Sequence, residues 1–184
     1  MKILVVYYSK TGNTKLIANV IHETASINHE STLLPVDKCS IDNLNNYDLL
    51  FIGSACHDAT LAKPMREFLK SMPNENTFIF AGFYTHSTTL SDGTARNKQL
   101  FSDWAGHCEE VFKKTSIDNG IQYIGAYHCQ GKASFLIEKF IKYKVINNRK
   151  EWKTYKKELR LHPTESELIS AKEFTKGIIE KILT

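Results

Sequence analysis

The amino-acid sequence predicts an α/β fold in which a five-stranded parallel sheet carries helices on both faces. Near-continuous apolar runs are typical of strands buried on both faces, and such runs lie at about 3–8, 48–54, 77–83 and 121–127. Stretches with helical spacing alternate with them, which implies parallel strands joined by right-handed crossovers. The length of 184 residues fits a single domain, 1–184, with a substantial core.

The remaining elements follow from periodicity and capping signals. The second strand along the chain is weaker, at 32–36, and Pro35 suits an edge position because proline cannot donate to a ladder. Thr164 and Glu167 have the spacing of a capping box, which fixes the start of the last helix. Apolar residues recur with helical spacing at about 14–25, 63–72, 97–118 and 165–183.

Composition narrows the classes of function. The cysteines form no Cys-x-x-Cys pair, so we expect no metal site, iron–sulfur cluster or disulfide framework. No apolar run has the length of a membrane span and the first residues already form a strand, so we expect no signal peptide, no membrane partner and a cytoplasmic location. A Gly-x-Ser-x-Gly elbow is missing, and we predict no catalytic residue.

The loop after the first strand carries the strongest functional signal. Helical spacing begins at its end, and the first turn of a helix has unpaired N–H donors and a partial positive charge that can bind an anion. The Walker spacing is absent, and a hydroxyl-lined loop suits a phosphate that is held but not cleaved. A capped polar turn is the alternative interpretation. The loop consists of Ser9, Lys10, Thr11, Gly12, Asn13 and Thr14.

This Ser-x-Thr-Gly-x-Thr pattern after an initial strand resembles the phosphate loop of the flavodoxin family. The resemblance implies FMN as cofactor, a three-layer flavodoxin-like fold and the strand order 2-1-3-4-5. In that order a ligand crevice lies at the carboxyl ends of the first and third strands, where the loops 9–14, 54–62 and 84–96 converge. Further similarity is found at 48–54, 63–69, 77–83, 121–132 and 162–165.

The resemblance places the loop after the third strand against the flavin ring. Related proteins have an aromatic residue there, and His57 offers a planar imidazole that titrates near neutrality. A surface histidine is the equal alternative. Cys56 fits a packing residue better than a redox thiol, because neither a cation nor a second cysteine adjoins it in sequence. The residues expected to contact the flavin are Ser54, Ala55, Cys56, His57 and Asp58.

Two further features of the loops concern the flavin. In flavodoxins a peptide after the third strand commonly rotates when the flavin takes up one electron, and glycine lowers the cost of that rotation. Ala59 stands about where a glycine is expected, so we expect little stable flavin radical. In the third loop Tyr84, Thr85 and His86 are expected to contact the flavin, whereas Asp92–Gly93 is typical of a polar turn.

A basic segment lies between the last strand and the last helix. From Lys139 to Arg160 there are nine Lys or Arg and two Glu, a net charge of +7, against +4 for the whole chain. The segment belongs to a long connection at about 131–162, which we interpret as an insertion of one or two basic amphipathic helices. We expect an acidic redox partner or an anionic substrate to dock on 139–160. Nucleic acid is disfavoured, and a solvated helix face is the alternative.

The preferred function is that of an FMN-binding, flavodoxin-like redox protein that carries electrons between redox partners. One alternative is an FMN-dependent NAD(P)H oxidoreductase that acts on a quinone or another small acceptor. The other is an interaction module that has the fold and binds no flavin. The fold alone does not choose among these functions.

Overall fold

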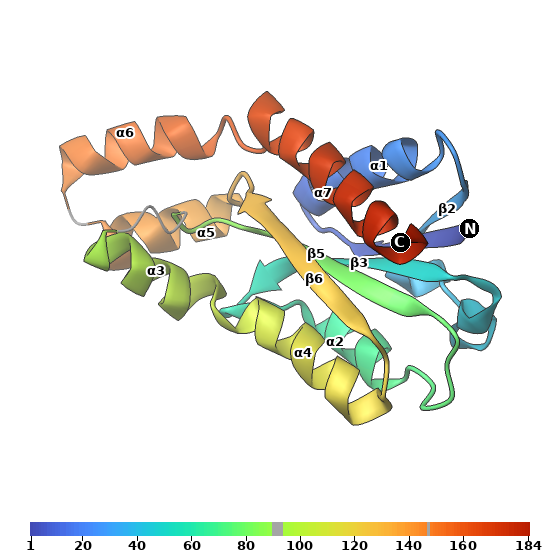
Figure 1. Cartoon of the computed structure of the whole chain (residues 1–184). Helices are drawn as coiled ribbons and strands as arrows, with labels where there is room; N and C mark the ends of the chain where they lie inside the picture. The colour runs from blue at the N-terminus through green and yellow to red at the C-terminus, as the bar shows by residue number, and fades with distance from the viewer. Residues whose placement is uncertain (90–93, 147) are drawn as a thin grey trace.

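Parallel strands form the central sheet of the computed structural model, which describes residues 1–89, 94–146 and 148–184 (Figure 1). Their order is β2-β1-β3-β5-β6. The predicted order 2-1-3-4-5 is confirmed, and only the numbering shifts, because the short β4 (Thr60–Leu61) pairs antiparallel with the end of β3. The other strands are β1 (Lys2–Tyr8), β2 (Glu30–Pro35), β3 (Leu49–His57), β5 (Ile79–His86) and β6 (Tyr123–Gln130).

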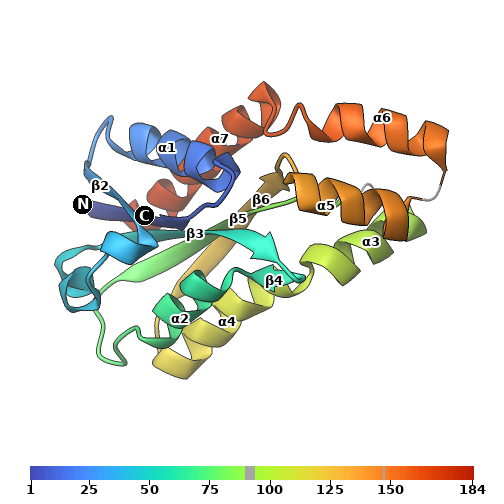
Figure 2. The ribbon, with the colours of Figure 1, turned by 180° about the vertical axis from the view of Figure 1, so that it is seen from behind.

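Helices cover both faces of the sheet (Figures 1 and 2). On one face Ile17 and Ile178 belong to a buried cluster beneath α1 and α7. On the other face Met65 and Phe112 belong to a second cluster beneath α2 and α4. None of the described helices is long and apolar enough to cross a lipid bilayer. The bounds are α1 (Asn13–Ala25), α2 (Lys63–Lys70), α4 (His107–Asn119) and α7 (Glu165–Leu183), with 3-10 helices at Val36–Lys38 and Ile41–Asn46.

The single helix expected at about 97–118 is wrong. The structure has α3 (Ala95–Ala105) and α4, which meet at Gly106. The backbone N–H of His107 donates to the carbonyl of Ala59 at 3.1 Å instead of continuing the helical ladder. A side chain at Gly106 would lie 2.6 Å from the carbonyl oxygen of Ser102, so the close junction requires glycine.

A strained two-residue turn joins β3 to β4. His57 pairs with Thr60, and the two residues between them, Asp58 and Ala59, have φ values of 52° and 64°. Left-handed backbone costs energy in residues with a Cβ, and alanine lacks the local hydrogen bonding that helps Asp tolerate it. The Ala59 carbonyl also accepts from the Cys108 thiol at 3.9 Å. The turn is therefore held in place by α4.

The insertion contains two helices. α5 (Phe135–Phe140) continues into a π-helical turn, Ile141–Val145, and α6 (Arg149–Leu159) follows. This agrees with the expected number of helices. The insertion has a small core of its own, made of Ala133, Ile141, Ile146, Trp152 and Leu159.

A buried carboxylate links the two helices of the insertion. Glu138 on α5 is only 6% exposed. Its oxygens accept from Arg160 Nε and Nη2 at 2.9 and 3.1 Å, and Lys156 Nζ lies 3.1 Å away. Hydrogen bonding to Arg160 is the main cause that lowers the pKa of Glu138. A buried carboxylate must keep such partners, so these contacts hold α5 against the end of α6.

Replacement of Ala59 by glycine should stabilise the protein. Ala59→Gly removes the Cβ from a left-handed residue, and we expect the free energy of unfolding to rise by about 0.5–1 kcal/mol. Ala55→Gly, in the extended end of β3, should instead lower it by about 0.5–1 kcal/mol. Urea denaturation of both variants measures the difference. A loss of stability in Ala59→Gly would contradict the strain inferred for the turn.

Replacement of Glu138 by glutamine should loosen the insertion and spare the sheet. Glu138→Gln removes the charge that binds Arg160 and Lys156, and we expect amide protection in α5 and α6 to fall about tenfold or more. Glu158→Gln, an exposed site on α6, is the matched control and should change little. Hydrogen exchange, corrected for intrinsic rates, measures both. Equal protection in the two variants would refute a structural role for Glu138.

The same ion cluster predicts a pH dependence. The pKa of Glu138 is lowered in the folded protein. Its contribution to stability is therefore complete above the ordinary glutamate pKa of about 4.3 and is lost as the pH falls through the lowered value. Protection of α5 and α6 in the parent should decrease below about pH 4, whereas in Glu138→Gln it should lose this pH dependence. An identical profile in both proteins would exclude Glu138 as the titrating group.

Candidate functional site

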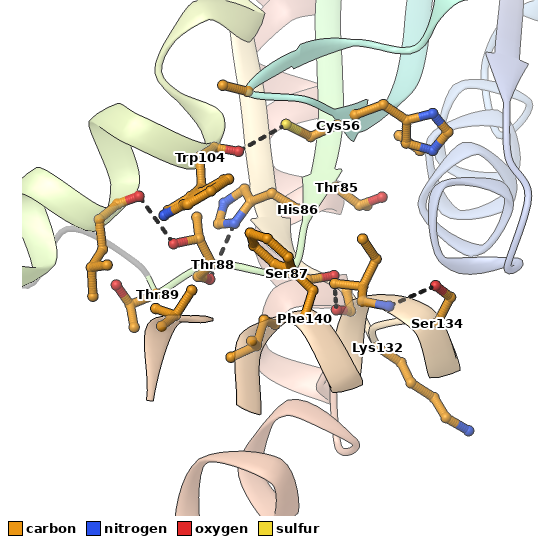
Figure 3. A pocket seen from close by; sticks show the side chains of 18 of the residues that line it. Cys56, Thr85, His86, Ser87, Thr88, Thr89, Trp104, Lys132, Ser134 and Phe140 are labelled. Carbon is orange, nitrogen blue, oxygen red and sulfur yellow. Dashed lines mark hydrogen bonds between the residues drawn. The ribbon is translucent and has the colours of Figure 1, made fainter. Parts of the chain in front are cut away.

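A cavity of about 740 Å³ lies at the carboxyl ends of β1, β3 and β5 (Figure 3). Each of the three loops that were expected to converge contributes to its lining. Lys10, Thr11 and Asn13 come from the first loop, 55–59 from the second, and 85–89 from the third. The Asp92–Gly93 turn lies outside the described residues. The structure thus brings together the loops that the sequence singled out.

The first loop turns tightly into α1. Gly12 has a φ of 93° and is the N-cap residue of the helix, and its N–H donates to Ser9 Oγ at 3.2 Å. A Cβ on Gly12 would meet no atom within 4 Å, so the space in front of the helix start is open. The first-turn N–H groups of α1 have no partner within the helix. An anion that enters this space meets these donors and the Lys10 ammonium.

The six residues of this loop divide into two roles. Lys10, Thr11 and Asn13 line the cavity. Thr14 is buried, and its hydroxyl lies 2.8 Å from that of Thr85, which ties the first loop to the third. Ser9 and Gly12, which bond each other, shape the turn in the same way. Three of the expected contacts therefore face the cavity, and the other three hold the loop.

The first loop is also tied to the end of β6. Asn13 Nδ2 donates to the Lys132 carbonyl at 2.8 Å and to Thr11 Oγ1 at 3.1 Å. The approach is close, because a Cβ on Gly131 would lie 2.8 Å from Asn13 Nδ2. The Gly131 N–H in turn donates to the His86 carbonyl at 2.7 Å. Glycine at 131 therefore lets two loops share one wall of the site.

The expected contact residues of the second loop also divide into one that supports the loop and others that line the cavity. Ser54 is buried; its hydroxyl accepts from the Ala62 N–H at 3.0 Å and donates to the Ala55 carbonyl at 2.8 Å, so it braces the loop. Ala55, Cys56, His57 and Asp58 line the cavity.

His57 and Cys56 have defined neighbours. The His57 ring meets Tyr8 edge-on, with centroids 6.0 Å apart. Burial is the main cause that lowers the pKa of His57, with smaller effects of Lys10 and Arg66 in the same direction, whereas Asp58 opposes them. The Cys56 thiol donates to the Trp104 carbonyl at 3.2 Å. The lowered pKa favours the neutral form of the His57 imidazole at neutral pH.

The third loop places Tyr84 and His86 differently. Tyr84 is 2% exposed and stacks on His128, with centroids 5.1 Å apart; it lies in the core and is not among the residues that line the cavity. Thr85 and His86 do line it. Side chains alternate along a strand, so Tyr84 and His86 share one face of β5 and Thr85 lies on the other; His86 lines the cavity because it is the last residue of the strand.

His86 is a neutral histidine at the cavity floor. Burial is the main cause that lowers its pKa to about 3. Its Nδ1 lies 3.2 Å from the Thr88 carbonyl, and its Nε2 lies 3.2 Å from His128 Nδ1. Because a carbonyl can only accept, Nδ1 carries the proton and Nε2 accepts from His128. Both ring nitrogens of His86 are thus engaged, and its ring adds an uncharged surface to the floor.

The sequence analysis missed the aromatic side of the site. Trp104 from α3 and Phe140 from α5 line the cavity, with their rings 5.3 Å apart in an edge-to-face arrangement. Tyr155 from α6 joins them and donates to the Ser87 carbonyl at 2.6 Å. Phe140 and Tyr155 lie in the insertion that was expected to form amphipathic helices, and nothing in their spacing distinguishes an apolar stripe that faces a core from one that faces a cavity.

These residues fit a ligand with a phosphate and a flat ring system, as FMN has. The open start of α1 with Lys10 and Thr11 suits the phosphate. The neutral imidazoles of His57 and His86, together with polar backbone in the second and third loops, suit a ring with polar edges. The carboxylates among the described lining residues are Asp58 and Glu151, and Glu151 is paired with Arg96.

Comparisons with known proteins agree with this fold. The chain is 29% identical over 191 positions to the flavodoxin-like domain-containing protein BilS of Clostridioides difficile, and the match covers 98% of both chains. A flavodoxin from the domain Archaea superposes with a TM-score of 0.60 at 19% identity and covers 100% of both chains. The flavodoxin of Streptococcus pneumoniae TIGR4 superposes with a TM-score of 0.63 at 14% identity, covering 98% of this chain and 99% of its own.

At these identities the superpositions demonstrate a shared fold. The family assignment rests on a sequence model, which describes a flavodoxin domain and matches residues 4–176. That match spans β1 to α7 and includes the phosphate loop, the turn after β3 and the insertion. The chain belongs to the flavodoxin domain family.

Proposed function

We propose that this protein binds FMN and transfers electrons through it. The observation that carries the proposal is the cavity at the ends of β1, β3 and β5, with the open start of α1 at one side. When bound, FMN supplies the one- and two-electron chemistry. The chain itself supplies binding, orientation and the surrounding electrostatics, and its family membership supports this assignment.

Each loop has a distinct task in this proposal. The α1 N–H groups, Lys10 and Thr11 bind the phosphate through charge-assisted hydrogen bonds. His57 packs on one side of the ring system. Ala55 and Thr85, near the ends of β3 and β5, line the cavity beside the polar edge of the ring. His86 lies at the floor and excludes charge there, because burial keeps it neutral.

The turn after β3 bears on one-electron chemistry. The Ala59 carbonyl is engaged by His107 and Cys108, so rotation of its peptide would break both contacts and strain a residue that has a Cβ. We therefore propose that stepwise reduction of this protein yields little stable flavin radical. A large radical signal would contradict the proposal. Ala59→Gly should raise that signal.

Removal of the phosphate contacts should weaken FMN selectively. In Lys10→Gln/Thr11→Ala we expect FMN affinity to fall about tenfold or more, since charge-assisted hydrogen bonds contribute roughly 1.5–3 kcal/mol each. Riboflavin, which lacks the phosphate, should bind the variant and the parent alike. Titration of flavin fluorescence measures both ligands. Lys15→Gln, an exposed site on α1, is the matched control. Equal losses for FMN and riboflavin would refute the phosphate assignment.

We further propose that an acidic redox partner docks on the basic segment 139–160. Lys156 and Arg160 are engaged by Glu138, so the docking charges are the other cations. They are exposed and belong to the insertion that borders the cavity: Lys139, Lys142, Lys144, Arg149, Lys150, Lys153 and Lys157. The four cysteines are free thiols, which suits the reducing cytoplasm that we propose as the location.

The salt dependence of electron transfer tests the docking proposal. With an acidic ferredoxin as probe partner, the parent rate should fall as salt rises, because salt screens long-range attraction. Lys153→Gln/Lys157→Gln should be slower and should show a flatter salt dependence. Lys172→Gln/Lys176→Gln, exposed on α7, is the charge-matched control. If both variants respond as the parent does, the basic segment is only a solvated surface.

A further inference from the structure

An apolar wall lies opposite the polar loops of the cavity. We use this name for six lining residues of α3 and α5: Leu100, Trp104, Phe135, Leu136, Ile137 and Phe140. Figure 3 shows Trp104 and Phe140 reaching toward His86 from two different helices. The phosphate-binding side of the cavity is polar, and the insertion side is apolar.

The apolar wall is exposed although its side chains are large. Phe135 is 68%, Leu136 75% and Trp104 40% exposed to solvent. Apolar surface in contact with water is unfavourable, and contiguous exposed patches mark binding sites. The wall differs from an ordinary surface stripe because its side chains line the same cavity as the flavin-binding loops.

The wall is held in place before any ligand arrives. Glu138, which adjoins Ile137 on α5, is bound by Arg160 and Lys156. Tyr155 on α6 donates to the Ser87 carbonyl, and Arg96 on α3 lies 2.6 Å from Glu151 on α6. These contacts join α3, α5 and α6 to the third loop. Because the wall is already ordered, less conformational entropy is lost when a ligand binds.

The dimensions and chemistry of the cavity favour a small molecule. Its volume of about 740 Å³ lies within the usual range of small-molecule sites, about 300–1,000 Å³. Trp104 and Phe140 meet edge-to-face, an arrangement that favours further aromatic contacts. His86 lines the floor of the same cavity, and its ring lies 5.3 Å from that of Phe101, which adjoins Leu100 on α3. A charged ligand group would find no counter-ion at that floor.

We propose that the apolar wall binds a small, flat, aromatic molecule beside the flavin. The proposal rests on FMN binding at the polar side of the same cavity. The insertion would then serve two purposes: its inner face binds the aromatic molecule, and its outer face carries the basic charges.

Binding of 1,4-naphthoquinone to the FMN-loaded protein tests the proposal. Equilibrium dialysis measures its affinity for the parent, for Phe135→Ser/Leu136→Ser in the wall, and for a matched control. The control is Tyr143→Ser/Leu161→Ser, because both residues are 65% exposed and neither lines the cavity. We expect a loss of about tenfold or more in the wall variant. The control should stay within about twofold of the parent, and FMN affinity should be equal in all three proteins.

Several outcomes would overturn the proposal. One is equal naphthoquinone affinity in the wall variant and the control, or no binding to the parent. Another is a parallel loss of FMN, which would show that the wall holds the flavin ring itself. A parent dimer that the wall substitutions convert to monomer would show that a second copy covers the wall. If the parent fails to bind FMN, the proposed function fails separately, and the same dialysis on the flavin-free chain still tests the wall.

Discussion

The parallel register of β1, β3 and β5 is the constraint on which the site depends. Tyr8 lies opposite Ser54, and Ser54 lies opposite Tyr84. The three strands therefore end side by side, and the next residues leave the sheet at one edge. The Thr14–Thr85 hydroxyl contact at 2.8 Å then fixes the first loop to the third. A shift of one strand by one residue would exchange its buried and exposed side chains and break this arrangement.

The insertion supplies the part of the cavity lining that the loops of the sheet do not. It has its own small core around Trp152, and it is attached to the site through Asn13, Ser87 and Arg96 and through the Gly131–His86 backbone hydrogen bond at the end of β5. Its basic character has two physical consequences. Part of the charge neutralises the buried Glu138, and the remainder lies on the surface. Loss of the internal part would loosen the cavity, whereas loss of the external part would change only encounter with charged partners.

Much of the fold was predictable because its signals are local. Apolar runs indicated the strands, and the capping box of Thr164 and Glu167 is present at the start of α7. The predicted helix at 97–118 failed because its break depends on a partner distant in sequence, the Ala59 carbonyl. The place of Trp104 in the site was not predicted for the same reason, because its helix lies beside α5 only after the insertion has folded.

The sequence by itself determined the strand pattern, the hydroxyl-rich composition of the loop after β1 and the basic character of the segment before α7, since these depend on residue type and spacing. Only the tertiary structure decided which side chains of each loop face the cavity. Tyr84 and His86 lie two residues apart on β5, yet Tyr84 is covered by the core, whereas His86 reaches the cavity floor. This difference depends on where β5 ends and on which helices cover it. Both follow from contacts between residues far apart in sequence, so no local sequence pattern predicts them.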